Sequence, residues 1–226
     1  MNEFIPGIDL DLFNSDDPTN VSTTVQLILL LTVLSIAPSI LILMTSFTRI
    51  VIVLSFVRTS LATQQMPPTQ VLISLALFLT FFIMAPTFSE INDQALAPFL
   101  NGEITQEEAF EEAAKPIKAF MSKHTREKDL MLFIEYAQME RPQSLDDIPL
   151  TALVPAFAIS EIKTAFQIGF MVFVPFLVID MIVASVLMSM GMMMLPPVMI
   201  SLPFKILLFV MVDGWYLVVK SLLLSF

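Results

Sequence analysis

The stretch Met188-Ser-Met-Gly-Met-Met-Met-Leu-Pro-Pro197 separates two long apolar runs in the last third of the chain. Its glycine frees the backbone from side-chain restriction, and its two prolines prevent a helix from continuing. Methionine side chains are unbranched and repack easily, so they fill irregular apolar gaps. The stretch therefore predicts a flexible apolar loop between two helices, although an apolar turn without special function remains an open alternative. The predicted loop comprises Met190, Gly191, Met192, Met193 and Met194, and the turn after it contains Pro196 and Pro197.

The composition predicts an all-α, membrane-associated protein. Of 226 residues, 56% are hydrophobic and only 14% are charged, and the mean hydropathy is +0.83. Soluble domains carry about 25% charged residues. The absence of cysteine excludes disulfides and thiol chemistry. The single histidine, His124, offers too few nitrogen ligands for a typical zinc or haem site, so no cofactor is predicted, and we interpret His124 as a solvated surface residue.

The charges are unevenly distributed along the chain. Residues 1–20 contain five acids and no base, residues 89–149 contain thirteen acids and six bases, and residues 21–88 contain only Arg49 and Arg58. No basic surface for nucleic acid is indicated. Because positive loops face the cytoplasm, both proline-containing turns are predicted on the cytoplasmic side, and residues 89–149 on the extracytoplasmic side.

Hydropathy and proline positions predict two long, kinked helical hairpins with a small soluble helical module inserted between them. After an acidic lead (1–20), the first hairpin (21–88) has an apolar arm of roughly 55 Å with a kink expected at Pro38, which is longer than one membrane span. Its turn contains Met66, Pro67 and Pro68, and its second arm is expected to end at Pro86. The second hairpin (150–226) turns at the methionine-rich loop. The similar turns leave a pseudo-repeat open.

The inserted module (89–149) is predicted to contain two amphipathic helices. Thr105 and Glu108 have capping-box spacing at the start of the first helix, and the second is expected over Arg126 to Met139. The inward-facing residues expected on them are Phe110, Ala113, Ala114, Ile117, Phe120, Met121, Leu130, Phe133, Ile134 and Ala137. A docking surface and a solvated cap are equally compatible with this pattern.

Charged residues within the apolar segments are candidate functional residues because each needs a partner away from lipid. They are Arg49, Glu161, Lys163, Asp180, Lys205, Asp213 and Lys220. Glu161 and Lys205 lie on opposite arms of the second hairpin, and we predict that they pair within one chain or between neighbouring chains. Asp213 and Lys220 are seven residues apart and are expected on one helix face. Asp180 has no obvious partner.

Enzymatic chemistry is disfavoured by the residues present. An aspartyl dyad of Asp180 and Asp213 is weakly supported, because no glycine-framed motif surrounds either carboxylate. Serine catalysis lacks a histidine in the apolar segments, and no glycine-rich phosphate loop is present. The possible hairpin repeat and the buried charges are compatible with a small-solute channel or a secondary transporter, which stays as the alternative function.

Several strings of the sequence closely resemble the FliP family, the flagellar relatives of SctR in type III secretion systems. These strings are Phe47-Thr-Arg-Ile-Val-Ile-Val-Leu-Ser-Phe56, Gln65-Met-Pro-Pro68, Phe78-Leu-Thr-Phe-Phe-Ile-Met-Ala-Pro86, Pro155-Ala-Phe157, Leu187-Met-Ser-Met-Gly-Met-Met-Met194 and Val212-Asp-Gly-Trp215. The resemblance extends from Val21 to Phe226.

This resemblance implies a subunit of the flagellar protein export gate in the bacterial cell membrane, at the basal body. Several copies, in a pentamer-like arrangement, would assemble with FliQ and FliR, next to FlhA and FlhB, and unfolded flagellar proteins would pass through the pore. The resemblance also implies hairpins stacked largely above the bilayer plane, and a methionine gasket at Met190 to Met194 that narrows the pore. A ring of methionines would close a pore to ions by apolar packing and yield to a passing chain.

Overall fold

The computed structural model describes residues 18–226, apart from residues 64, 143, 145–146 and 193. The chain divides into two compact units, Met1–Leu41 and Ile42–Phe226. In the first unit, the described residues belong to helix α1 (Pro18–Leu43), which remains helical through Pro38, where a kink was predicted. Most of the predicted acidic lead lies outside the described residues.

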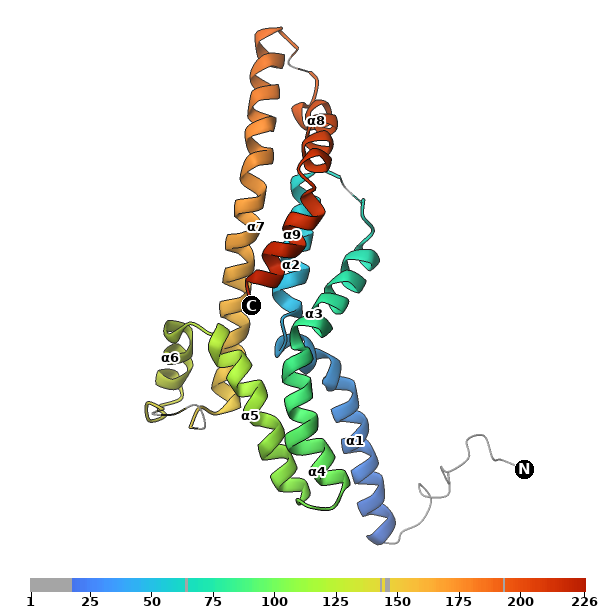
Figure 1. The fold of residues 1–226 in the computed structure, drawn as a ribbon, viewed down its shortest axis with the longest axis vertical. Coiled ribbons are helices and arrows are strands. Elements are labelled where there is room, and N and C mark those ends of the chain that lie inside the picture. Colours follow the sequence, from blue (N-terminus) through green and yellow to red (C-terminus); the bar gives the residue numbers. More distant parts are fainter. Residues whose placement is uncertain (1–17, 64, 143, 145–146, 193) are drawn as a thin grey trace, which may run out of the picture. The chain divides into compact units, whose positions relative to one another are not determined.

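The second unit consists of helices joined by loops, with no strand among its described residues (Figure 1). They are α2 (Phe47–Ser60), α3 (Thr69–Ile91), the π-helix η2 (Asn92–Leu96), α4 (Ala97–Leu100), α5 (Gln106–His124), α6 (Glu127–Tyr136), α7 (Leu150–Ser189), α8 (Pro197–Met211) and α9 (Gly214–Leu224).

Helix α7 is the axis on which the second unit is organised. It begins at Leu150, as predicted, and its 40 residues make a helix of about 60 Å. Helices α2, α5, α6 and α8 all pack along it (Figure 1). The largest apolar core joins Val53 and Leu54 of α2 to Leu72 of α3 and Ala165 of α7, all of them buried. The packing of α2 against α7 therefore fixes the centre of the unit.

Helix α3 corrects the predicted end of the first hairpin. The helix continues through Pro86 to Ile91 and then, by way of η2, into α4, which ends at Leu100. Proline removes one backbone donor and clashes with the preceding turn, but the surrounding apolar residues hold the helix together across this defect. Consequently the expected division between residues 88 and 89 falls within a continuous helical stretch.

The inserted segment matches its predicted start and differs from the prediction further along both helices. The capping box is confirmed: Glu108 Oε2 accepts a hydrogen bond from the Thr105 amide at 2.7 Å, and the Glu108 amide donates to Thr105 Oγ1 at 3.3 Å. Phe110 and Ala137 were predicted to face inward, but Phe110 is 69% exposed and Ala137, at the end of α6, is exposed as well. Helix α6 stops at Tyr136, near the left-handed Gln138, rather than at Met139.

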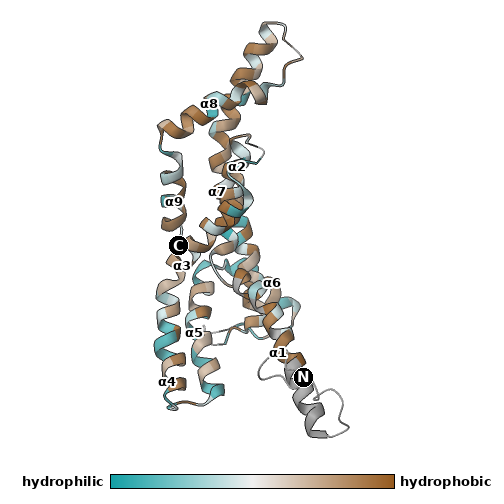
Figure 2. Ribbon diagram, turned by 90° about the vertical axis from the view of Figure 1, so that its right-hand side faces the viewer, coloured by the Kyte–Doolittle hydropathy of each residue, from teal (hydrophilic) through white to brown (hydrophobic). Residues whose placement is uncertain are grey.

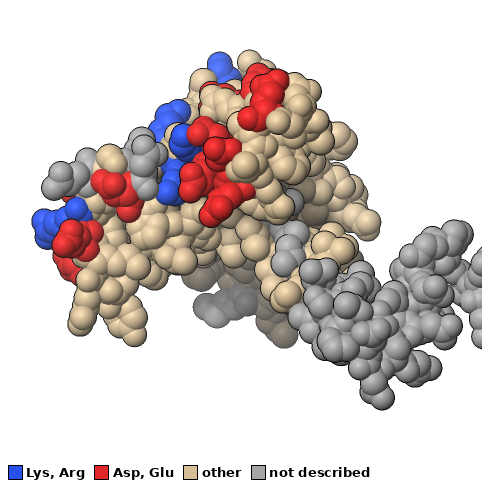
Figure 3. All heavy atoms as spheres, turned by 90° about the horizontal axis from the view of Figure 1, so that it is seen from below, with Lys and Arg blue, Asp and Glu red and all other residues tan. Residues whose placement is uncertain are grey.

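Two helical stretches, Thr69–Leu100 and Leu150–Ser189, are long and apolar enough to cross a membrane. A third span is possible if α8 and α9, which meet at a bend of 63°, count as one. Figure 2 shows the predominance of apolar residues along α7 and α8 and the polar residues toward the ends of α4 and α5. Charged side chains gather on the end of the molecule seen in Figure 3, where α5 and α6 lie. The all-α, membrane-type fold is thus confirmed.

Candidate functional site

The methionine-rich loop closes the C-terminal end of α7. The amide of Met192 donates to the Leu187 carbonyl, and the amide of Gly191 donates to the Met188 carbonyl, both at 3.0 Å. Gly191 has a φ of +78°, a left-handed conformation that glycine adopts without steric cost. This pattern of two backward hydrogen bonds around a left-handed glycine is a Schellman-type helix end. Gly191 therefore explains why α7 stops where it does.

The methionine side chains of the loop project away from the helical hairpin. Met190 is 62% exposed, Met192 is 42% exposed and Met194 is 97% exposed, whereas Met193 lies outside the described residues. A Cβ placed on Gly191 would meet no atom within 4 Å, so the loop is open on that side. Because apolar side chains concentrated at an exposed tip mark interaction surfaces, the loop is a candidate contact site.

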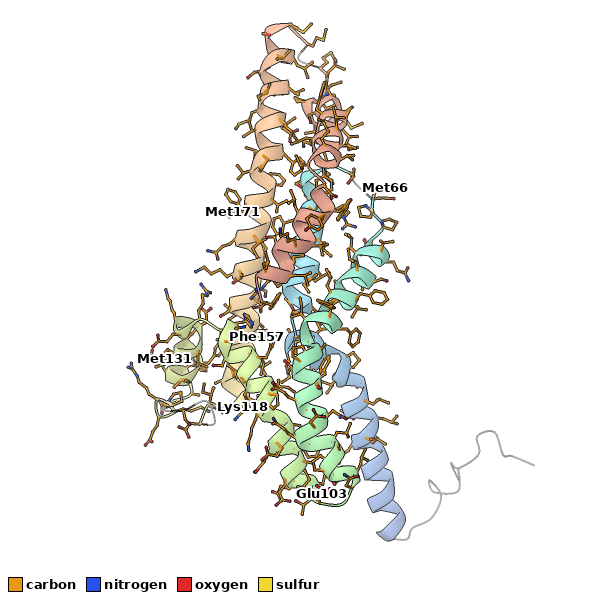
Figure 4. The ribbon with its side chains drawn as sticks, in the orientation of Figure 1. Met66, Glu103, Lys118, Met131, Phe157 and Met171 are labelled. Carbon is orange, nitrogen blue, oxygen red and sulfur yellow. The ribbon has the colours of Figure 1, made fainter. Side chains whose placement is uncertain are left out.

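Both proline-containing turns lead directly into a helix. Pro196 precedes α8, and Pro197 is the first residue of that helix, a position where the missing amide hydrogen is not needed. In the first hairpin, Met66 and Pro67 lie in the loop between α2 and α3, where Met66 is exposed (Figure 4). Pro68 then caps the start of α3. Side-chain hydrogen bonds also hold the first turn: the Thr63 hydroxyl donates to the Met66 carbonyl at 2.5 Å, and Arg58 Nη1 donates to Thr69 Oγ1 at 2.9 Å.

A buried ion pair joins α2 to α7. The guanidinium of Arg49 donates to Glu161 Oε2 through Nε at 2.8 Å and to Oε1 through Nη2, and the two side chains are 3% and 0% exposed. Arg49 Nη1 also donates to the Ser225 carbonyl at 2.6 Å, and the guanidinium lies 3.8 Å from the centre of the Phe226 ring. Two-point arginine–carboxylate pairs combine strength with fixed geometry. Arg49 therefore anchors α2, α7 and the segment after α9 together.

A second ion pair joins α7 to α8 and corrects the predicted pairing. Lys205 Nζ lies 2.6 Å from Asp180 Oδ2, and Ser201 Oγ donates to Asp180 Oδ1 at 2.5 Å. The predicted Glu161–Lys205 pair within one chain is wrong, and so is the expectation that Asp180 lacks a partner. Different levels of α7 face different helices: Glu161 faces α2, whereas Asp180 faces α8.

Asp213 and Lys220 do not pair within the described chain. Asp213 lies at the bend between α8 and α9 with a φ of +52°, immediately before α9 and outside the continuous helix that the prediction assumed. Lys220 is exposed, and its Nζ lies 5.8 Å from the centre of the Tyr216 ring. The two-turn spacing that placed both residues on one helix face applies only within one continuous helix.

His124 is not the solvated residue expected from the sequence. Its ring lies 5.0 Å from that of Phe120 and 5.2 Å from that of Phe226. Burial, together with the positive charges of Arg49 and Lys123, lowers the pKa of His124 from 6.5 to about 4. The imidazole is therefore neutral at physiological pH.

Sequence reasoning missed a polar contact that fixes α6 on α7. The Ser160 hydroxyl donates to Asp129 Oδ2 at 2.6 Å and accepts from the Arg126 amide at 3.1 Å. Burial raises the pKa of the Asp129 carboxyl, but the hydrogen bonds from Ser160 and Arg126 outweigh burial, so the pKa is lowered overall. No spacing rule reveals this contact from the sequence.

Ser201 was also missed, although a signal for it exists in the sequence. It lies four residues before Lys205 and therefore on the same face of α8. A hydroxyl group one helical turn before a lysine in an apolar helix can bind the same carboxylate as the lysine, and Ser201 does so at Asp180. Among the described residues, no group of three His, Asp or Glu side chains has an arrangement that could hold a metal.

Comparison with known proteins identifies the family of the chain. The model of the FliP family matches residues 30–222, a range that contains the loop and both ion pairs. The chain is 75% identical over 226 residues to the flagellar biosynthetic protein FliP of Bacillus subtilis (strain 168), with all of both chains covered.

The chain belongs to the FliP family.

More distant FliP proteins match most of the chain as well. Flagellar biosynthetic protein FliP of Pectobacterium carotovorum subsp. carotovorum is 54% identical over 203 residues, which cover 90% of this chain and 79% of that protein. FliP of Aquifex aeolicus (strain VF5) is 49% identical over 224 residues, which cover 98% and 92% of the two chains. The resemblance to FliP seen in short strings of the sequence is thereby confirmed over nearly the whole chain.

Proposed function

We propose that this FliP-family chain is a pore-forming subunit of the flagellar protein export gate. It would pass unfolded flagellar proteins across the cytoplasmic membrane without catalysing a reaction. The observation that carries the proposal is the exposed group of methionines at the tip of the second hairpin, which no described part of the chain covers. In the proposed complex, several copies assemble with FliQ and FliR, next to FlhA and FlhB.

The chemistry of the loop suits a seal that opens without a reaction. When several copies surround one axis, their Met190, Met192 and Met194 side chains form an apolar constriction that excludes water and ions. Thioether side chains change rotamer readily, so the constriction adapts to the varied side chains of a passing polypeptide. Gly191 gives the loop backbone freedom to move while α7 stays intact.

The ion pairs supply the rigid support that such a seal needs. Arg49 and Glu161 hold α7 against α2, and Asp180 and Lys205 hold α7 against α8. Both arms of the second hairpin are therefore fixed below the loop, so that only the tip is free. This arrangement supports a gate in which the helices keep their positions while the loop side chains rearrange.

Ion conductance of the closed gate tests the seal directly. Replacing Met192 and Met194 with alanine is expected to raise the leak of small ions across the membrane of cells that produce the assembled gate. Met211→Ala is the matched control, because Met211 is 77% exposed on α8 but lies outside the loop. A leak as low in the loop variant as in the control would contradict the gasket.

The mass of the intact detergent-extracted complex separates the export gate from a solute transporter. A gate subunit is expected to be extracted as several copies of this chain together with two other hydrophobic proteins. A complex that contains this chain alone and binds a small solute would instead support the transporter.

We also propose that residues 89–149 lie outside the cytoplasmic membrane and that the two proline-containing turns face the cytoplasm. Because the chain contains no cysteine, single introduced cysteines can test this orientation. A cysteine at exposed Glu107 on α5 is expected to react with a membrane-impermeant maleimide added outside the cytoplasmic membrane. A cysteine at Met66 in the first hairpin turn is expected to react only after permeabilisation. The reverse labelling pattern would show that residues 89–149 face the cytoplasm.

A further inference from the structure

An open groove of about 480 Å³ lies between α5 and the stretch formed by the end of α3, η2 and α4. Ile91, Ala95 and Phe99 line one side of it, and Ala109 and Phe110 line the other. The lining also includes Leu96, Gln106 and Ala113. All of these residues except the glutamine are apolar. The methionine-rich loop and the two ion pairs contribute no residue to this lining, so the groove is separate from the candidate site described above.

No described part of the chain covers the larger apolar side chains of this groove. Phe110 is 69% exposed, Leu96 is 50% exposed and Phe99 is 40% exposed. Leu100, which follows at the end of α4, is 74% exposed. Apolar side chains that lie together on an exposed surface mark sites of interaction. These exposures favour a docking surface over the solvated cap that the sequence left open.

The secondary structure of the groove favours a helical partner. Every lining residue belongs to a helix, and the described residues contain no strand edge with which an extended peptide could pair. On α5 the lining residues recur every three or four positions, a spacing that creates the ridges and grooves into which a second helix packs. This lined face extends about 10 Å from Gln106 to Ala113, or about two turns of a partner helix.

The elements that form the groove are acidic on both sides. Residues 59–114, which include both walls, contain seven acids and no lysine or arginine. Five of these acids are exposed and form no salt bridge within the described part of the chain: Glu90, Asp93, Glu103, Glu107 and Glu111. Glu107 is three residues before Phe110 and therefore beside it on α5, and Glu103 lies in the loop that joins α4 to α5 (Figure 4). A positively charged partner complements this rim.

Two other occupants of the groove would bring like charges together. A second copy that used the same face would place one acidic rim against another, and an anionic membrane surface would meet the same acids. The first base of α5 after the groove, Lys115, does not reverse the sign of the rim, because its Nζ lies 2.6 Å from Glu112 Oε1.

We propose that this groove binds a cationic amphipathic helix of another protein. The apolar face of that helix packs on Phe99 and Phe110, and its lysine or arginine side chains lie over the acids of the rim, such as Glu107. Apolar contact supplies the affinity, whereas the rim selects the sign of the partner's charge. This proposal does not depend on the export-gate function.

Binding of designed peptides tests the proposal. The full chain, purified without other subunits, is incorporated into nanodiscs of phosphatidylcholine, and empty nanodiscs give the background. The probe is a fluorescent peptide of about four helical turns with leucine on one face and lysine on the other. We expect it to bind about tenfold more tightly than a peptide with glutamate in place of lysine, and than one of the same composition without helical periodicity. If either comparison peptide binds as tightly as the probe, the proposal is wrong.

Variants locate the bound probe. Phe110→Ala should leave the fold intact, because the side chain is exposed, and should weaken probe binding about tenfold. Glu107→Gln combined with Glu111→Gln should weaken binding by a similar factor and reduce its dependence on salt. Unchanged binding by either variant contradicts the proposal.

Two control variants change the same kinds of side chain outside the groove. Leu132→Ala removes an apolar side chain that is 59% exposed on α6, and Glu127→Gln combined with Glu140→Gln removes two exposed acids. Both controls should bind the probe as the unmodified chain does. Weakening as large as that of the groove variants would show that the probe binds through charge or apolarity anywhere on the surface.

Two further measurements distinguish the other occupants. Native mass spectrometry should find the same number of copies for Phe110→Ala as for the unmodified chain; a loss of copies would show that a second copy fills the groove. A spin label on a cysteine introduced at position 106 should respond more to a water-soluble nickel complex than to dissolved oxygen. The opposite preference would show that lipid covers the groove and would overturn the proposal.

Discussion

Arg49 of α2 and Glu161 of α7, 112 positions apart in the chain, form a two-point ion pair in the interior of the protein. Neither residue is more than 3% exposed, so each charge depends on the other for compensation. Burying two charges costs free energy that only good geometry offsets, and a pair of this kind fixes how two helices align. The pair is therefore a determinant of register between α2 and α7.

Removing one member of this pair is expected to destabilise the protein strongly. Glu161→Ala strands the Arg49 guanidinium and should lower the free energy of unfolding by about 3–5 kcal/mol. Denaturant unfolding of the detergent-solubilised protein, followed by the fluorescence of the single tryptophan, Trp215, measures the change.

Two further variants test whether the loss of stability comes from the unpaired buried charge. Arg49→Met combined with Glu161→Leu should recover most of the loss, because no unpaired charge remains. Arg141→Ala removes an exposed partner of Glu135 and should cost less than about 1 kcal/mol. A Glu161→Ala protein as stable as Arg141→Ala would show that the buried pair has no structural role.

The pair between α7 and α8 should respond in the same sense but more weakly. Asp180→Asn leaves Lys205, which is 3% exposed, without a counter-charge, and we expect a loss of about 3 kcal/mol because Asp180 itself is 26% exposed. Faster amide hydrogen exchange in α8 should accompany the loss. Asp180→Asn combined with Lys205→Met should return exchange toward the original rate; if it does not, the effect is not due to the stranded charge.

Close approach of α2 and α7 makes Gly169 sensitive to any side chain. A Cβ at position 169 would lie 2.5 Å from Phe56 Cγ and 3.0 Å from Phe56 Cβ, so the ring must move. Overpacking of this kind costs about 1–3 kcal/mol, and Gly169→Ala should lower the unfolding midpoint accordingly. Phe56→Leu in the same chain should restore part of the loss. Ser185→Ala, at an exposed position on α7, should leave the midpoint unchanged.

His124, which packs against Phe120 and Phe226, should have a pKa far below that of a free imidazole. Because His124 is the only histidine, its ring resonances in an NMR titration of the detergent-solubilised protein are unambiguous. We expect a pKa of about 4, against 6.5 for an unhindered histidine. Phe226→Ala opens the cluster and should move the pKa upward. A pKa near 6.5 in the unmodified protein would mean that the ring is solvated.

The same shift predicts how stability depends on pH. The unfolded chain takes up a proton at His124 near pH 6.5, whereas the folded protein takes it up only near pH 4. Between these values the unfolded state binds more protons, so the contribution of the neutral imidazole is complete above pH 6.5 and is lost as the pH falls toward 4. His124→Phe should flatten this part of the stability profile.

The helical architecture followed from composition and periodicity, but the interhelical partners did not. Long apolar runs, the capping box at Thr105 and the start of α7 at Leu150 are local signals, and each was read correctly from the sequence. Which charged residues pair depends on how each helix is rotated about its axis and on the angle at which two helices cross. No single stretch of sequence determines either quantity. Glu161 was assigned to Lys205 because both lie in the second hairpin, whereas its partner Arg49 belongs to the first.

Two predictions, one at Pro86 and one at His124, are wrong for a common reason. Pro86 predicts a helix end, but α3 continues through it, with Met84 and Thr87 on either side buried against the rest of the fold. The charged sequence neighbours of His124 predict a solvated side chain. In the fold, Phe120 and Phe226 pack against its ring, and Arg49 lies near enough to affect its pKa. Both errors arise from contacts that sequence proximity does not report.

Two ion pairs on one helix, α7, limit how that helix can move. Glu161 and Asp180 are nineteen residues, or about 28 Å, apart along α7, and each ties the helix to a different neighbour. When both ion pairs are formed, they oppose sliding of α7 along α2 and rotation of α7 about its own axis. The length beyond Asp180, about 14 Å of helix ending at Ser189, still buries Leu187, so the methionine-rich loop at its tip is held at a set distance from the second ion pair.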